Sequence, residues 1–340
     1  VVGTVAGLRA VKNIPRLVRA VAAAGPNVKL AIAGEGPERA AIEAEAERLG
    51  MSDRLMMGGF LRDPARYVGL FDIFALSSDI MLEVLGIFGA QDAYLEGVSA
   101  FGTLAQFATF GIGAAGLVML VNLVHGHGFA VLIGPKRAAR RDLIAVTLAV
   151  ALVLFVQELL PPWYMLADAE MRSLPRWALL IPVTLLVLLV QVGTEELMFR
   201  GYLQQQLACL SPRRWVWMGL PSVMFGVLHY WNGHGAAEGA LWAFWATLLG
   251  LACADLTARS GNLGPAIGLH LANNAFALLL YGIADWPGTG VALFIFPYED
   301  PAAFSDGIDA LMAPWAVLHM ATQCLSVLVM WLAARIAIRR

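Results

Sequence analysis

The feature that most limits how this chain can fold is a series of long apolar runs from about residue 100 to the C-terminus. A helix needs about 20 predominantly apolar residues to cross the roughly 30 Å hydrocarbon core of a bilayer. Backbone N–H and C=O groups find no water there, so each run is predicted to be helical. About seven runs qualify, at approximately residues 100–124, 143–160, 177–199, 214–231, 238–257, 263–284 and 312–335.

Composition supports a membrane location. The 340 residues are 59% hydrophobic and 14% charged, whereas soluble domains are about 25% charged. The net charge is −2, so there is no basic excess and no nucleic-acid partner is expected. Membrane lipids are the expected surroundings. The three cysteines, Cys209, Cys253 and Cys324, lie far apart in apolar surroundings and are interpreted as packing residues.

Loop charges predict an orientation, because short cytoplasmic loops collect Lys and Arg. Basic residues follow the first, third, fifth and seventh runs: Lys136, Arg137, Arg140, Arg141, Arg213, Arg214, Arg259, Arg335, Arg339 and Arg340. Residues 285–309 contain five acidic residues and no Lys or Arg, and fall on the other side. We therefore predict an integral protein of a bacterial inner (plasma) membrane, with these basic loops in the cytoplasm.

Polar residues at membrane depth are costly, so those inside the runs are candidate functional residues. The third run meets Glu195 and Glu196 after a long apolar stretch. Glu196 and Arg200 are four residues apart and share a helix face, where they can pair. Glu195 is rotated by about 100° and is the less neutralised carboxylate, which makes it the better general base. An interfacial carboxylate pair is the alternative interpretation.

Two further runs carry polar residues at helical spacing. The fourth contains Phe225 and His229 at i, i+4, and the sixth contains His270 and Asn274 on one face. A lone His such as His229, near a run end, is by itself more often an interfacial residue than a catalyst. Together, a carboxylate, two imidazoles and a carboxamide provide water activation, proton delivery and oxyanion stabilisation, the requirements of peptide hydrolysis.

Glu-Glu-x-x-x-Arg at 195–200, Phe-x-x-x-His at 225–229 and His-x-x-x-Asn at 270–274 resemble the three motifs of the CAAX protease and bacteriocin-processing (CPBP) family. That family includes the type II CAAX prenyl endopeptidases. The resemblance covers most of residues 140–290 and implies an intramembrane endopeptidase acting on a hydrophobic or lipid-anchored peptide. It makes Glu195 the water-activating base, assisted by His229. His270 and Asn274 become the oxyanion pair, and Glu196, Arg200 and Phe225 the supporting residues.

The need for a metal stays open at this stage. No cofactor is certain, but Glu195, His229 and His270 could form a two-His, one-carboxylate zinc site with an open position for water. The sequence has no His-Glu-x-x-His helix. A carboxylate with two imidazoles can also activate water without a metal, as the glutamate-dependent mechanism proposed for the family implies.

Residues 1–79 show a different pattern, in which short β-branched runs at 1–5, 28–33 and 73–77 alternate with amphipathic stretches at 14–24 and 37–49. The sequence thus predicts a short Rossmann-like α/β fragment (1–79), a connector (80–99) and an all-α polytopic membrane domain (100–340).

The fragment resembles part of the C-terminal domain of GT-B glycosyltransferases, through the stretches at 7–13, 32–38 and 74–79. Lys12 matches the Lys that contacts the donor diphosphate in that family. The family's acidic motif and its second domain are absent from this sequence, so we expect no glycosyl transfer. We interpret the segment as a remnant, a fusion or a misjoined gene, with Met81 as a possible original start.

Two other functions use the same residues. Glu, His and Asn inside membrane helices also build ion relays, so a proton-coupled carrier is one alternative. Carriers of this type often contain two repeated halves, and this sequence contains no such repeat. A non-catalytic membrane scaffold is the second alternative, although a scaffold has no need of an exposed base.

Overall fold

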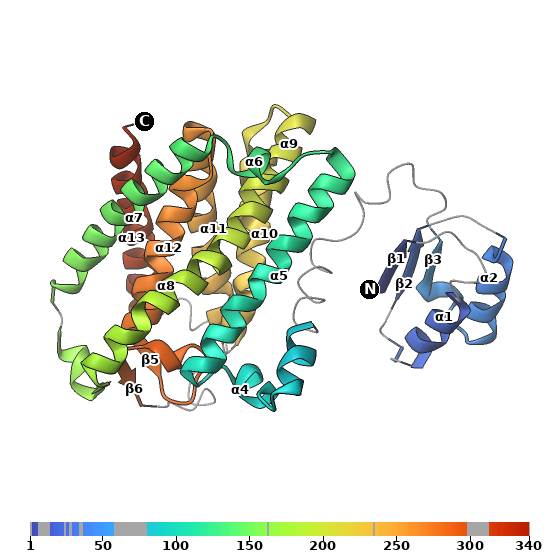
Figure 1. The fold of residues 1–340 in the computed structure, drawn as a ribbon, viewed down its shortest axis with the longest axis horizontal. Coiled ribbons are helices and arrows are strands. Elements are labelled where there is room, and N and C mark those ends of the chain that lie inside the picture. Colours follow the sequence, from blue (N-terminus) through green and yellow to red (C-terminus); the bar gives the residue numbers. More distant parts are fainter. Residues whose placement is uncertain are drawn as a thin grey trace. The chain divides into compact units, whose positions relative to one another are not determined.

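The computed structural model describes residues 2–5, 14–23, 25–26, 29–33, 37–57, 80–161, 163–233, 235–297 and 313–339. By its contacts the chain divides into two units (Figure 1). The first comprises Val1–Ile73 with the short stretch Asn122–Gly126, and the second comprises Phe74–Val121 with His127–Arg340.

The first unit is a small α/β structure. Its three parallel strands, in the order β1-β2-β3, are Val2–Val5, Leu30–Ala33 and Leu55–Met57. Helices α1 (Ile14–Ala23) and α2 (Arg39–Arg48) bury Val18 and Ile42 in the same apolar cluster as Leu30.

Strands and helices alternate in this unit as predicted, but β3 was not predicted. Its three residues, Leu-Met-Met, lack the β-branched side chains that mark the other strands. The strand predicted at 73–77, together with Lys12, lies outside the described residues.

The second unit is mainly helical (Figure 1). Its longer helices are α5 (Ala100–His125), α7 (Lys136–Glu158), α8 (Leu174–Glu196), α11 (Ala236–Ser260), α12 (Gly264–Leu280) and α13 (Pro314–Ile338). Its shorter helices are α4 (Gln91–Glu96), α6 (Phe129–Ile133), α9 (Gln204–Leu210) and α10 (Leu220–Leu228).

Irregular helical turns and a small sheet complete this unit. π-helical turns at Leu197–Leu203 and Trp215–Gly219 lie on either side of α9. 3₁₀ turns lie at Trp163–Asp168, His229–Asn232 and Thr289–Val291. The sheet, in the order β4-β6-β5, consists of Glu170–Met171, Phe294–Phe296 and Tyr281–Ile283.

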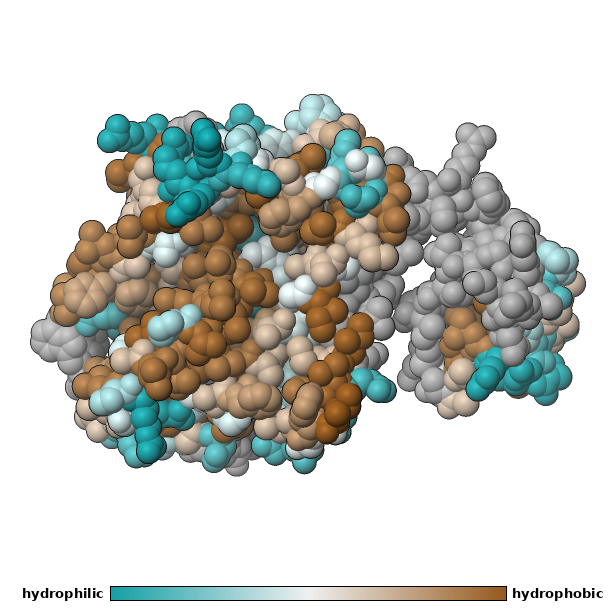
Figure 2. Space-filling view, viewed as in Figure 1, coloured by the Kyte–Doolittle hydropathy of each residue, from teal (hydrophilic) through white to brown (hydrophobic). Residues whose placement is uncertain are grey.

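Four of the described helices are long and apolar enough to cross a membrane: Ala100–His125, Leu174–Leu210, Ala236–Ser260 and Ala316–Ile338. Figure 2 shows apolar residues across the middle of this unit and hydrophilic residues at its two ends. The other three predicted runs are also helical. However, α12 is short, the first turns of α7 are charged, and the run at 214–231 is divided among π, α and 3₁₀ turns. Seven spans therefore remains a prediction.

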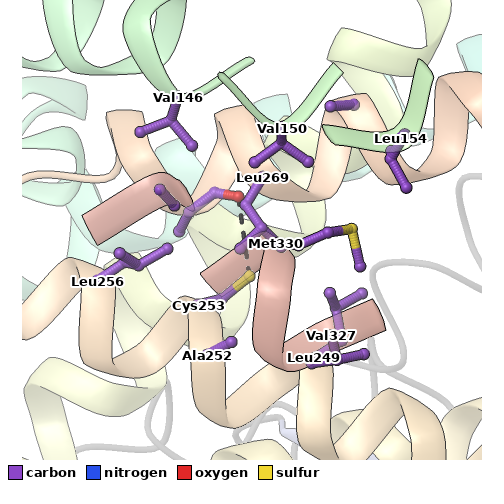
Figure 3. Packing of buried hydrophobic residues seen from close by; sticks show 13 residues of the cluster. Val146, Val150, Leu154, Leu249, Ala252, Cys253, Leu256, Leu269, Val327 and Met330 are labelled. Atoms are coloured by element: carbon purple, nitrogen blue, oxygen red, sulfur yellow. Dashed lines mark hydrogen bonds between the residues drawn. The ribbon is translucent and has the colours of Figure 1, made fainter. Parts of the chain in front are cut away.

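Small residues allow the helices around the site to pack closely, as is typical of membrane helices. A Cβ atom on Gly264 or Gly268 of α12 would lie 2.0 or 2.7 Å from a backbone oxygen of α7. Figure 3 shows the apolar core of α7, α11, α12 and α13, in which the Cys253 thiol donates to the Ala266 carbonyl at 3.7 Å.

A second apolar cluster joins α8 to α12. Leu188 and Val192 of α8 pack there with Leu271, Ala275 and Leu279 of α12. This contact fixes the end of α8 beside the middle of α12.

Candidate active site

The two carboxylates lie where α8 changes its helical geometry. α8 ends at Glu196, and the π-helical turn Leu197–Leu203 continues the chain. π-helical turns are rare and are found frequently at functional sites. Arg200 Nη1 donates to Glu196 Oε1 at 3.0 Å, and both side chains are 0% exposed. The pairing predicted from the i, i+4 spacing is therefore present.

His270 lies between the two carboxylates. Its Nδ1 is 2.9 Å from Glu196 Oε1, and its Nε2 is 3.7 Å from Glu195 Oε2. Because Glu196 is paired with Arg200 it accepts hydrogen bonds, so Nδ1 carries a proton and donates. The sequence did not predict the contact between His270 and Glu196, which joins α8 to α12.

His229 lies at the start of the 3₁₀ turn after α10. Its Nδ1 is 2.8 Å from the Phe225 carbonyl, which can only accept, so Nδ1 is the donor and Nε2 is left for the site. Glu195 lies close enough to His229 to interact with it electrostatically. The structure therefore brings His229 into the same cluster as the carboxylates.

Phe225 joins the three motifs. Its ring lies 4.4 Å from the His229 ring and meets the His270 ring edge-on at 5.6 Å. The Arg200 guanidinium carbon lies 4.7 Å from the centre of the Phe225 ring, a cation–π distance. The predicted supporting residue thus contacts both imidazoles and the buried cation.

Asn274 lies one helical turn beyond His270 on α12, and its side-chain bonds lead away from the carboxylates. Its Nδ2 donates to Gln191 Oε1 at 3.4 Å, and its Oδ1 accepts from Asn273 Nδ2 at 3.1 Å. Gln191 is 6% exposed and lies one turn before Glu195 on α8. Sequence reasoning missed Gln191, although an amide in an otherwise apolar stretch, four residues before Glu195, was a usable signal.

Glu195 differs from Glu196 in its partners. Glu195 Oε2 is buried and has no hydrogen-bond partner among the described residues. Glu196 Oε2 is buried and unpaired as well, but Glu196 Oε1 accepts from Arg200 and His270, whereas Glu195 accepts no hydrogen bond among the described residues. Glu196 is thus the neutralised carboxylate and Glu195 the one still open to a water molecule or a substrate group.

The residues give limited support for a zinc site. Glu195 Oε2 and His270 Nε2 are neighbouring donors at 3.7 Å. Within the described ranges, however, no group of three or more His, Cys, Asp or Glu side chains is arranged to hold a metal ion. The predicted third ligand, His229, does not complete such a set, so these residues do not fit a two-His, one-carboxylate zinc site.

Comparison with known proteins separates the same two parts of the chain. Residues 177–276 match the family described as "Type II CAAX prenyl endopeptidase Rce1-like", and residues 1–88 match "Glycosyl transferases group 1". The chain is 32% identical over 102 residues to "Uncharacterized protein YyaK" of Bacillus subtilis (strain 168). That alignment covers 30% of this chain and 34% of the relative, about a third of its length. No solved structure matches.

The matched range 177–276 contains all seven motif residues, and both predicted resemblances are confirmed. The family match and the four long apolar helices together identify an integral membrane protein. The motif-bearing segment of this chain is similar to the type II CAAX prenyl endopeptidases, and it follows a segment similar to group 1 glycosyltransferases.

Proposed function

We propose that this protein is an intramembrane endopeptidase that hydrolyses a peptide bond in a membrane-anchored, prenylated or hydrophobic polypeptide. The observation that carries the proposal is the different bonding of two adjacent carboxylates. Glu196 Oε1 accepts hydrogen bonds from Arg200 and His270, whereas the Glu195 carboxylate accepts none among the described residues and lies 3.7 Å from His270 Nε2. A purely structural ion pair needs only the first of these arrangements.

Glu195 is assigned as the general base. A water molecule between Glu195 Oε2 and His270 Nε2 would be within reach of both atoms, which are 3.7 Å apart. Glu195 takes a proton from this water, and the resulting hydroxide attacks the carbonyl carbon of the scissile bond. General bases typically contribute about 10²- to 10⁴-fold to a rate.

His270 and Asn274 are assigned to the oxyanion that forms on the attacked carbonyl. Since His270 Nδ1 already donates to Glu196, the form that also donates from Nε2 is the imidazolium. Asn274 contributes an N–H from Nδ2. Preorganised donors of this kind stabilise developing negative charge most strongly where water is excluded.

Collapse of the tetrahedral intermediate breaks the C–N bond. The leaving amine takes the proton that Glu195 removed from water, directly or through His229, whose Nε2 is left for the site. The products are a carboxylic acid and an amine, and transfer of the acid proton to the amine gives a carboxylate and an ammonium group. Glu195 returns to its ionised form, and protons balance without a further reactant.

The substrate class follows from the location of the site. The motif residues lie on helices that belong to a membrane unit, so a bound polypeptide has to approach through or along the bilayer. The basic residues Arg213 and Arg214 follow the segment that carries Glu195, which favours a site open to the cytoplasm of a bacterial inner membrane. A lipid-anchored cytoplasmic tail fits this arrangement.

The test is cleavage of a fluorogenic peptide library, with and without a prenyl group, by the full-length protein in detergent. Wild type should be active, and Glu195→Gln should lose about 10²-fold or more. Activity that survives a chelator supports the glutamate mechanism, whereas loss with rescue by zinc makes the protein a metalloprotease.

No cleavage of any peptide by a folded wild-type protein would overturn the proposal. Glu195-dependent proton uptake by vesicles would then favour a carrier. Equal function of wild type and Glu195→Gln in cells would favour a scaffold.

A further inference from the structure

A short exposed apolar stripe precedes the first long helix and lies outside the catalytic motifs. Residues 80–87 form a helix. Ile80, Val84, Ile87 and Phe88 follow the i, i+4, i+7, i+8 pattern of one helix face. All four are exposed, and Ile87 and Phe88 are 80% and 75% exposed. A different face of the same helix is buried at Leu85.

This helix folds back onto α4. The chain turns at Gly89, which has a φ of +63°, a conformation that favours glycine. Gln91 Nε2 at the start of α4 donates to the Leu82 carbonyl at 2.8 Å. A Cβ on Gly86 would lie 2.7 Å from that nitrogen, so the glycine makes room for the bond. Residues 80–97 therefore form a helical hairpin, here called the 80–97 hairpin.

The hairpin is fixed to the beginning of α5. Gln106 Nε2 donates to the Tyr94 carbonyl at 2.7 Å, and Thr109 Oγ1 donates to the Tyr94 hydroxyl at 3.3 Å. A Cβ on Gly102 would lie 1.9 Å from the Ala93 carbonyl oxygen, so α4 and α5 are in close backbone contact. The hairpin thus lies where α5, a helix able to span the bilayer, begins at Ala100.

The length and charge of the hairpin limit what can cover its exposed face. The described part of this helix, residues 80–88, is far too short to span a bilayer, and apolar helical segments of this length are buried, re-entrant or interfacial. The exposed Leu95 and Phe101 continue the apolar surface from the hairpin onto α5. The hairpin contains Glu83, Asp92 and Glu96 but no Lys or Arg. It therefore belongs with the side opposite the basic loops.

We propose that the 80–97 hairpin lies in the lipid interface at the non-cytoplasmic surface, with Ile87, Phe88 and Leu95 among the acyl chains and Glu96 in water. Its apolar face continues the lipid-facing surface of α5, so the same bilayer covers both. Burial of apolar area in the interface stabilises such a helix without a crossing. The proposal does not depend on the protease function.

Spin-label depth measurements test it. Single cysteines are introduced in a Cys209→Ser, Cys324→Ser background, which keeps the buried Cys253. The test positions are Ile87→Cys, Phe88→Cys and Leu95→Cys, and the matched control is Glu96→Cys, which is exposed on α4 and rotated by about 100° from Leu95. The full chain is reconstituted in phosphatidylethanolamine–phosphatidylglycerol nanodiscs. Collision rates with oxygen, which concentrates in lipid, and with a water-soluble nickel chelate are then compared.

The proposal expects a severalfold higher oxygen-to-nickel ratio at the three apolar positions than at position 96. Equal ratios with high nickel access at all four positions would place the stripe in water and overturn it. Low access to both reagents at 87, 88 and 95 would mean that protein covers the stripe, either another part of this chain or a second copy. That result also overturns the lipid assignment.

Discussion

Arg200 is a charged side chain with no exposed surface, in contact with one carboxylate and the faces of two aromatic rings. Removing one partner of a buried ion pair costs about 3–5 kcal/mol, because the other charge is left uncompensated. We therefore expect Glu196→Gln to lower the free energy of unfolding by about that amount. Thermal unfolding of the purified protein in detergent measures the change.

Glu195→Gln is the matched control for this prediction. It makes the same replacement of a carboxylate by a carboxamide at the neighbouring residue, but Glu195 Oε2 has no hydrogen bond to lose. Its melting temperature should stay close to that of wild type while its activity disappears. Equal destabilisation by the two substitutions would contradict the different roles assigned to the two acids.

Gln191 should affect the catalytic rate through Asn274. Gln191 Oε1 accepts a hydrogen bond from Asn274 Nδ2 at 3.4 Å. Gln191→Leu removes the acceptor, so the Asn274 amide can turn away from the oxyanion. We expect kcat to fall by about 10- to 100-fold, with little change in KM. Gln191→Glu keeps an accepting oxygen and should recover part of the rate. A change in KM alone would indicate that Gln191 acts on substrate binding instead.

Residue spacing was enough to predict some of the site and not the rest. The Glu196–Arg200 pair lies within one helix, so the i, i+4 rule predicts it directly. The bonds from His270 to Glu196 and from Asn274 to Gln191 cross between α8 and α12. Such contacts depend on the relative rotation of the two helices. The sequence pattern of a single helix does not determine that rotation.

At the scale of helices and strands, the apolar runs predicted the positions of the long helices well. Their length is a direct requirement of the bilayer, which explains the agreement for α5 and α11. The changes of geometry at Leu197–Leu203 and Trp215–Gly219 were not predicted, since neither stretch has a residue pattern that distinguishes a π-helical turn from an α-helix. The strand β3 was missed for a related reason, because Leu and Met do not distinguish strand from helix.

The contact between α10 and α11 depends on Gly226. A Cβ there would lie 2.0 Å from Thr247 Oγ1 and 2.3 Å from the Ala243 carbonyl oxygen. Gly226→Ala should push α10 away from α11, destabilise the protein by about 1–3 kcal/mol or more, and lower activity by moving Phe225 and His229. Thermal unfolding and peptide cleavage measure the two effects.

Gly193→Ala is the control for the packing prediction. It also replaces a helical glycine, two residues before Glu195, but no atom lies within 4 Å of its Cβ position. Alanine is the better helix former by about 0.5–1 kcal/mol, so stability should be unchanged or higher. If the two glycine substitutions behave alike, close packing of α10 on α11 is not what Gly226 provides.

At the scale of the whole molecule, the basic loops predict which end faces the cytoplasm. Cys209 is exposed near the end of α9, close to Arg213 and Arg214, and serves as a native reporter. A membrane-impermeant maleimide should label it in inverted vesicles and not in intact cells. In a Cys209→Ser background, Asp285→Cys on the opposite side should show the reverse. Labelling of Cys209 in intact cells would contradict the assigned orientation.

The π-helical turn Leu197–Leu203 also affects how this chain should be aligned with its relatives. In a π-helical turn the backbone hydrogen bonds join residues i and i+5, whereas in an α-helix they join residues i and i+4. Each hydrogen-bonded turn therefore contains one more residue. Deleting one residue there would convert the turn to regular α-helix. The wider turn absorbs the extra residue, so α9 would keep nearly the same direction relative to Glu195. Within this stretch, a one-residue gap in an alignment therefore signals the presence or absence of the π-helical turn, and the residues beyond the gap remain equivalent.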